Sequence, residues 1–99
     1  MIEPKTLDEA FEMVCQETLQ TFIRKHKDYG KENVLEMQEL GIAIRNSEKL
    51  SRLKHLLMNN LKPENESLDE TWIDIAVYAM IALMYRRGRF EKLGLRENV

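Results

Sequence analysis

Two pairs of carboxylates, each at the spacing of one helical turn, are the residues of this chain best suited to chemistry. Glu36 and Glu39 are three positions apart, and Glu70 and Asp74 are four positions apart. Both spacings place the two side chains on one face of a helix. Oxygen ligands brought together from two helices are the hard ligands that Mg²⁺ prefers. The four carboxylates therefore form a candidate magnesium site, although a pair such as Glu36 and Glu39 is also common on solvated helix faces.

Asp74 is the only charged residue between Thr71 and Tyr85. The side chains of this stretch are apolar on nearly all sides of the predicted helix, which is typical of a helix that is buried on most of its faces. A buried carboxylate needs a positive partner, which could be a divalent metal or a basic side chain. The alternative to a metal site is therefore a structural salt bridge from Asp74 to an arginine, with Glu70 acting only as a helix cap.

The same apolar stretch predicts self-association. A chain of 99 residues is too small to surround a helix that is apolar on nearly every face. We therefore expect a homo-oligomer, in which other copies of the chain cover the remaining apolar surface.

Basic residues near the candidate site could bind phosphate. Arg45, Glu48 and Arg52 fall on one side of a predicted helix, with Lys49 nearby. These cations could neutralise the carboxylates structurally, or they could hold a phosphate chain. Further cations that could hold phosphate lie at and around a polar turn: Lys25, Lys27 and Lys31.

The other reactive side chains predict no chemistry of their own. His26 and His55 have no matching ligand spacing and are interpreted as surface residues. Cys15, the single cysteine, has no obvious base partner, so we expect a packed thiol. Trp72 could stack on a nucleobase, but a core position on the buried helix face is the preferred interpretation.

These residues are all expected on or between helices. No segment alternates with the period of a strand, and only two prolines and four glycines interrupt the chain. Thr6 with Glu9 and Ser67 with Glu70 have capping-box spacing, which predicts two helix starts. We expect a first helix over 6–28, followed by a polar turn over 27–33 and a short helix over 34–40 that is interrupted at Gly41. A longer helix is expected from Ile42 to about Asn59, and a linker over 61–65 follows it. The last helix is expected from Ser67 to Arg86, before a tail over 89–99 with one further turn around Phe90 and Leu93.

Length and composition restrict the class of protein. Residues 1–99 are expected to form a single domain, with 43% hydrophobic and 32% charged residues as in globular proteins. The net charge of −2 removes the general electrostatic reason to expect binding to nucleic acid or to an anionic membrane. No apolar run resembles a signal peptide or is long enough to span a membrane. We therefore expect a cytoplasmic protein.

Four blocks of sequence between residues 27 and 78 carry a family resemblance. The blocks are Lys27-Asp28-Tyr29-Gly30 followed by Asn33, Glu39-Leu40-Gly41-Ile42, Arg45 with Glu48-Lys49-Leu50-Ser51-Arg52-Leu53, and Asn65 through Tyr78. In this order they resemble the nucleotide modification associated domain 1 family, which is known mostly from bacteriophages and bacteria. That family is distantly similar to the all-α nucleoside triphosphate pyrophosphatases of the MazG and dimeric dUTPase type.

The resemblance implies a fold and a ligand. It implies an all-α, MazG-like bundle of three to four main helices, completed by oligomerisation, with a nucleotide ligand in the cytoplasm of a bacterial host. The pyrophosphatases bind Mg²⁺ through paired carboxylates on two helices and hydrolyse the α–β phosphate bond. This chain departs from their pattern, because it has Glu36-x-x-Glu39 in place of Glu-Glu-x-x-Glu and Glu70-x-x-x-Asp74 in place of Glu-x-x-Asp. Glu48 also stands where the closer family has Asp.

Together, the residues and the resemblance predict a nucleotide-binding domain that is a candidate Mg²⁺-dependent nucleotide pyrophosphohydrolase. In this hypothesis the four carboxylates hold Mg²⁺, which lowers the pKa of an attacking water, and Glu48 is the candidate base. The cations that would neutralise the leaving pyrophosphate are Lys27, Arg45, Lys49 and Arg52. The alternative is a non-catalytic phage-type module that binds a host protein or sequesters a nucleotide, with the carboxylates paired to Arg45 and Arg52.

Overall fold

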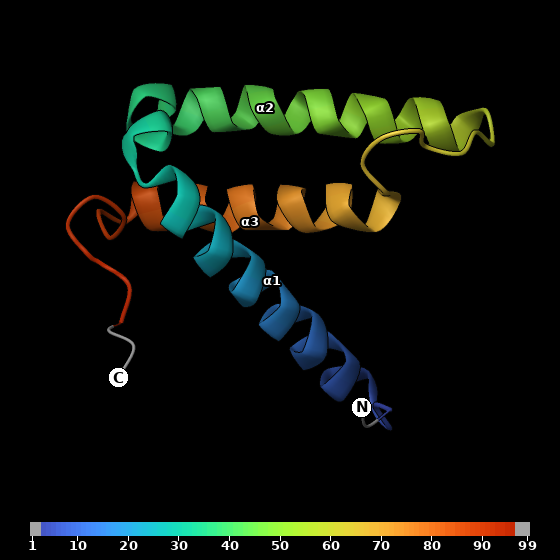
Figure 1. The fold of residues 1–99 in the computed structure, drawn as a ribbon, viewed down its shortest axis with the longest axis horizontal. Coiled ribbons are helices and arrows are strands. Elements are labelled where there is room, and N and C mark those ends of the chain that lie inside the picture. The colour runs from blue at the N-terminus through green and yellow to red at the C-terminus, as the bar shows by residue number, and fades with distance from the viewer. Residues whose placement is uncertain (1–2, 97–99) are drawn as a thin grey trace.

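The computed structural model describes residues 3–96, and every regular element within that range is an α-helix. In chain order these are α1 (Leu7–Tyr29), α2 (Glu32–Met58) and α3 (Leu68–Arg86). Helices α2 and α3 run antiparallel side by side, while α1 crosses α3 and its N-terminal half projects away from both helices (Figure 1). The prediction of an all-α fold is confirmed.

The two predicted helix starts are confirmed by their caps. The Glu9 backbone N–H donates to Thr6 Oγ1 at 3.2 Å, and the Glu70 N–H donates to Ser67 Oγ at 3.1 Å. Each hydroxyl satisfies a backbone N–H that has no partner inside its own helix. Both helix starts are thus determined by local sequence.

The break between α1 and α2 is shorter than the predicted turn over 27–33. Helix α1 continues through Tyr29, and α2 begins at Glu32. Gly30 ends α1 with a φ of 67°, a left-handed conformation that glycine adopts without steric cost, and its N–H donates to the His26 carbonyl at 2.8 Å. Gly30 therefore ends α1 and leaves only one residue before α2 begins.

The predicted interruption at Gly41 is wrong in position, because the kink of α2 lies at Gln38. Gln38 has φ 60° and ψ −175°, whereas Gly41 continues the helix. A Cβ atom at position 41 would overlap Cγ of Met37, on the preceding turn. Gly41 therefore acts through its missing side chain, which leaves room for Met37 beside the kink, and not through backbone freedom.

Helix α3 ends where predicted, at Arg86, and Gly88 follows with a φ of 70°. The further helical turn expected around Phe90 and Leu93 is wrong, since residues 89–96 are irregular. Phe90 instead lies in the core with only 4% of its surface exposed, and Lys31 Nζ donates to the Glu91 carbonyl at 2.6 Å. The chain thus buries the Phe90 side chain in the core and does not form the predicted further turn. The last part of the expected tail, 97–99, lies outside the described residues.

The hydrophobic core sits where the three helices and the tail meet. Its buried members are Val34, Ile42, Val77, Ile81 and Phe90. Within residues 3–96, none of the helices combines the length and the apolar character needed to cross a membrane.

Candidate functional site

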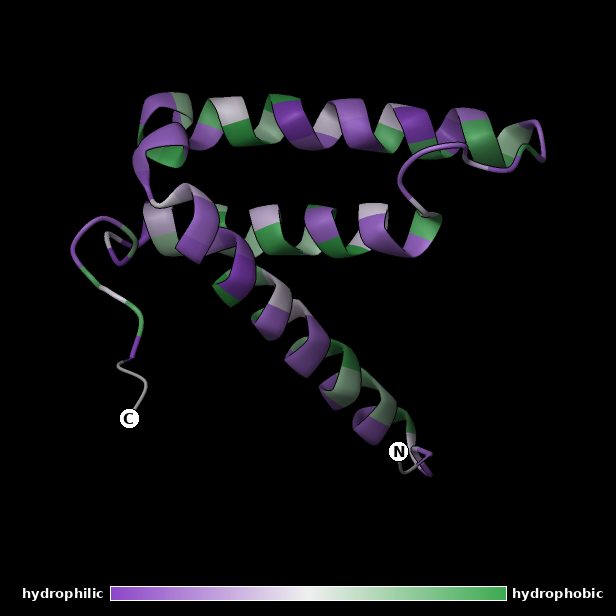
Figure 2. Ribbon diagram, viewed as in Figure 1, coloured by the Kyte–Doolittle hydropathy of each residue, from purple (hydrophilic) through white to green (hydrophobic). Residues whose placement is uncertain are grey.

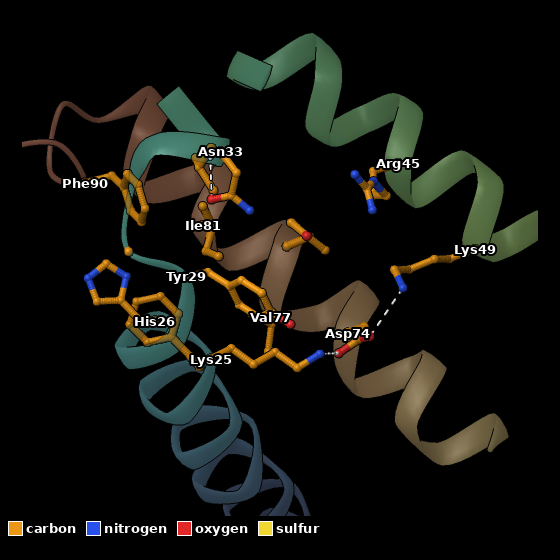
Figure 3. A pocket seen from close by; sticks show the side chains of 14 residues that line it. Lys25, His26, Tyr29, Asn33, Arg45, Lys49, Asp74, Val77, Ile81 and Phe90 are labelled. Atoms are coloured by element: carbon orange, nitrogen blue, oxygen red, sulfur yellow. Dashed lines mark hydrogen bonds and ion pairs between the residues drawn. The ribbon is translucent and has the colours of Figure 1, made fainter. Parts of the chain in front are cut away.

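A cavity of about 320 Å³ opens at the junction of the three helices (Figure 3). All three helices, the α1–α2 connection and the tail contribute to its walls. The lining residues are Phe22, Lys25, His26, Tyr29, Gly30, Asn33, Val34, Arg45, Lys49, Asp74, Val77, Tyr78, Ile81 and Phe90. The volume is within the range of about 300–1,000 Å³ typical of small-molecule sites.

One end of the cavity is charged. Lys25 of α1 and Lys49 of α2 both reach the Asp74 carboxylate of α3, with Nζ–Oδ distances of 2.7 and 3.3 Å (Figure 3). Arg45 lies on the same side of the cavity, one helical turn from Lys49, and none of the ion pairs among residues 3–96 involves it. Three cations thus face one carboxylate, which leaves this end with a formal excess of two positive charges.

Asp74 is held in its charged form by the two lysines. Burial alone would raise the pKa of this carboxyl, but the hydrogen bonds and ion pairs from Lys25 and Lys49 outweigh that effect and lower its pKa. The carboxylate also fixes both ammonium groups at the mouth of the cavity. The positive partner of Asp74 is therefore lysine, and not the arginine that the structural alternative predicted.

The other end of the cavity is aromatic. The His26 ring stacks on Phe22, with ring centroids 5.5 Å apart, and meets Phe90 edge-on at 6.1 Å. The interpretation of His26 as a surface residue is wrong, because the side chain is half-buried between these two rings. Aromatic faces of this kind favour the binding of planar, partly apolar groups.

A second cavity, of about 460 Å³, lies between α1 and the start of α3. The Lys25–Asp74 pair lines both cavities and so separates them. The second cavity is rich in carboxylates, and its walls are formed by Glu17, Gln20, Thr21, Arg24, Lys25, Glu66, Asp69, Glu70, Ile73 and Asp74.

The four predicted magnesium ligands do not fit a shared metal site in this arrangement. Asp74 is neutralised by lysines, and Glu70 accepts a hydrogen bond from Ser67 Oγ at 3.1 Å, as a helix cap does. Glu39 pairs with Arg86 at 3.0 Å, and Glu36 is separated from it by the kink at Gln38. Across residues 3–96, no three acidic, histidine or cysteine side chains are grouped so that they could hold a metal ion.

The structure separates the predicted phosphate-binding residues into two groups. Arg45 and Lys49 line the first cavity, whereas Lys27 is exposed and lines neither cavity. Arg52 donates to Thr71 Oγ1 at 2.7 Å and to the Glu66 carbonyl, so it fastens α2 to the start of α3. Glu48, the candidate base, is exposed and also lines neither cavity.

The sequence did not predict several of the residues that line the first cavity. His26 follows Phe22 by four positions, and this spacing already places the two rings on one face of α1. Tyr29 and Asn33 belong to the first block of the family resemblance. Phe90, by contrast, has no local signal, because its place in the wall depends on the path of the tail.

No protein-family model, curated protein or solved structure matches this chain. The resemblance to the nucleotide modification associated domain 1 family thus rests on the sequence blocks alone.

Proposed function

We propose that the first cavity binds a nucleotide, with the phosphates at the charged end and the base at the aromatic end. The observation that carries this proposal is the division of one cavity into two ends of different chemistry. Lys25, Arg45 and Lys49 face one end, and the rings of His26 and Phe90 face the other (Figure 3). A nucleotide has the same division between an anionic part and a planar part.

The charged end is organised before any ligand arrives. Asp74 holds Lys25 and Lys49 in place, so a phosphate group meets ammonium groups that have already lost much of their freedom. Arg45 adds a planar guanidinium, which matches the geometry of phosphate oxygens. Asp74 is a positioning residue in this arrangement, because it acts through the two lysines.

The proposed function is nucleotide binding without hydrolysis. Without a metal-binding group of carboxylates in residues 3–96, the arrangement of this single chain does not supply the Mg²⁺ chemistry expected from the sequence. Pyrophosphohydrolase activity stays a prediction, and release of pyrophosphate from nucleoside triphosphates with and without millimolar Mg²⁺ tests it directly.

Isothermal titration calorimetry tests the proposal. The probes are deoxynucleoside triphosphates, the matching monophosphates, the free nucleosides and inorganic pyrophosphate. We expect affinity to increase with phosphate number and to fall with added salt. Arg45→Ala should weaken triphosphate binding about tenfold or more, since a charge-assisted hydrogen bond contributes about 1.5–3 kcal/mol.

Lys54→Ala is the matched control, because Lys54 is an exposed cation of the same helix that lines neither cavity. It should bind nucleotides as the parent protein does. Failure of every phosphate-bearing probe to bind, or equal losses in Arg45→Ala and Lys54→Ala, would contradict the proposal. The first outcome would favour the alternative of a module that binds a host protein.

A further inference from the structure

The face of α3 that points away from α1 and α2 is apolar along its whole central part. Successive residues of a helix are 100° apart, so Trp72, Ala76, Ala79, Met80 and Leu83 share this face. We call these five residues the outer face. Trp72, Met80 and Leu83 are 51%, 48% and 46% exposed. Trp72 therefore lies neither in the core, as the sequence suggested, nor at the cavity.

The residues on the rest of α3 explain why the outer face is free. Thr71 bonds Arg52 of α2, the Ile75 carbonyl accepts from Asn46 of α2, and Asp74 pairs with Lys25 of α1. These contacts occupy the sides of α3 that face its two neighbours. A third side remains, and no described residue of the same chain covers it.

The single chain exposes far more surface than a protein of its mass does when it is monomeric. Its accessible surface is 8265 Å², against about 5,900 Å² expected for a folded monomer of 11.7 kDa. Its radius of gyration is 15.3 Å, against about 13 Å for a compact chain of 100 residues. The excess of about 2,400 Å² per chain, or about 4,800 Å² for two chains, lies at the upper end of the total area of about 2,000–5,000 Å² that obligate homodimers bury.

The N-terminal half of α1 contributes to this excess. The stripe of α1 that contains the buried Thr18 and Thr21 continues toward the N-terminus as Leu7, Phe11 and Val14, all exposed. Figure 2 shows green, apolar segments among the hydrophilic ones on the part of α1 that projects away from α2 and α3. A continuous stripe of this kind is typical of a surface that a partner covers.

We propose that α3 pairs with α3 of a second copy of this chain, antiparallel and around a two-fold axis. In this register Trp72 lies against the partner's Leu83, and Ala76 lies against the partner's Ala79. The small residues are then at the centre, where two helices approach most closely, and the large ones are at both ends. The outer face is therefore complementary to itself, as an isologous interface requires.

Charge favours the same occupant and the same direction. The outer face carries no charged residue, so two copies can meet without opposing like charges. Asp69 lies at its N-terminal end and Arg87 at its C-terminal end. Antiparallel pairing brings each Asp69 toward the Arg87 of the other copy. This inference does not depend on the proposed nucleotide binding.

Light scattering of the purified chain at about 10–100 µM tests the pairing. We expect a mass of about twice 11.7 kDa for the parent, and a dissociation constant raised roughly thirtyfold or more in Trp72→Glu. Ala79→Phe should also weaken the dimer, because the larger ring separates the helices. Leu40→Glu is the matched control, since Leu40 is a 73% exposed apolar residue of α2 outside the outer face, and it should keep the mass of the parent.

Fluorescence of the parent gives a second readout, because Trp72 is the only tryptophan. Its quenching by acrylamide should increase on dilution as the indole becomes exposed. Ala79→Phe stays informative if Trp72→Glu fails to fold, since the exposed Ala79 leaves room for a ring in the single chain. A monomeric parent, or a dimer whose mass Ala79→Phe leaves unchanged, would overturn the proposal.

Discussion

Asp74 joins all three helices through one carboxylate. It lies on α3 and binds Lys25 of α1 and Lys49 of α2, while only 9% of its side chain is exposed. Removing one member of such a group leaves the other charges without a partner in a partly dehydrated place. The residue therefore matters for stability as well as for the cavity.

Asp74→Asn should lower the free energy of unfolding by about 1–3 kcal/mol, since it leaves two lysines without their anion. The loss should stay below that of a fully buried pair because Lys25 is 43% exposed and water screens it. Urea denaturation measures this, with Glu64→Gln, an exposed change in the linker, as the control. A mutant as stable as the parent would contradict the lysine pairing and favour the metal-site hypothesis.

The stability contributed by Asp74 should depend on pH in the acid range. Its pKa is lowered in the folded protein, so the contribution is fully present above the ordinary aspartate pKa of about 3.9. It is lost as the pH falls below that value toward the folded pKa. The stability difference between the parent and Asp74→Asn should therefore be constant from pH 7 to 5 and shrink below about pH 4. A difference that stays constant down to pH 3 would disprove the linkage.

The pairing of α2 with α3 depends on Arg52. Its guanidinium donates to Thr71 Oγ1 and to the Glu66 carbonyl, and Thr71 is completely buried. The Thr71 hydroxyl in turn donates to Glu66 Oε2 at 2.7 Å. Arg52 thus connects α2, the linker and the first turn of α3.

Arg52→Ala should destabilise the protein by about 2–4 kcal/mol because both charge-assisted hydrogen bonds are lost. Nucleotide affinity should stay within about twofold of the parent, since Arg52 lines neither cavity. Melting curves and titrations on the same variant measure both quantities. Arg52→Lys should be intermediate, because lysine keeps the charge but lacks the planar fork. If Arg52→Ala kept the stability of the parent but bound nucleotides weakly, Arg52 would instead be a phosphate-binding residue.

Replacing Gly41, next to the kink of α2, should change the stability in the direction opposite to that expected from helix propensity. Gly41→Ala would gain about 1 kcal/mol from propensity alone, but the new Cβ overlaps Met37. Overpacking costs about 1–3 kcal/mol, so we expect a net loss of stability. In a Met37→Ala background the same change should become neutral or stabilising, and this double-mutant cycle isolates the contact. Gly94→Ala, which meets nothing within 4 Å, serves as the control.

The core of the molecule is small for the surface that it supports. Among residues 3–96, six apolar side chains are buried, while sixteen large ones are exposed. In the dimer proposed above, a chain with this balance would gain much of its stability by burying surface against its partner. Folding and assembly are therefore expected to be linked.

The midpoint of thermal unfolding should rise with protein concentration, because a dimer dissociates when it unfolds. We expect a steady increase of the midpoint between about 1 and 100 µM, followed by circular dichroism. Trp72→Glu should show a lower midpoint that no longer changes with concentration. A concentration-independent midpoint for the parent would indicate a monomer that is stable by itself.

Local sequence was enough to predict the helices and most of their ends. Thr6, Ser67, Gly30 and Gly88 act on the backbone within one turn of their own position, so neighbouring residues are enough to predict them. Arg45 and Lys49 also emerged from spacing alone, because both belong to one turn of one helix. The excess of apolar residues on α3 was equally visible without coordinates.

Which distant residues meet depends instead on how the helices pack against one another. Lys25 and Asp74 are 49 positions apart, and their pairing depends on where α1 crosses α3. Phe90 enters the core through the path of an irregular tail, and the kink of α2 falls at Gln38 and not at the glycine. Local sequence does not encode such choices, since several lysines and arginines could neutralise the same carboxylate. The crossing of the helices selects one arrangement, and with it the charged and aromatic ends of the cavity.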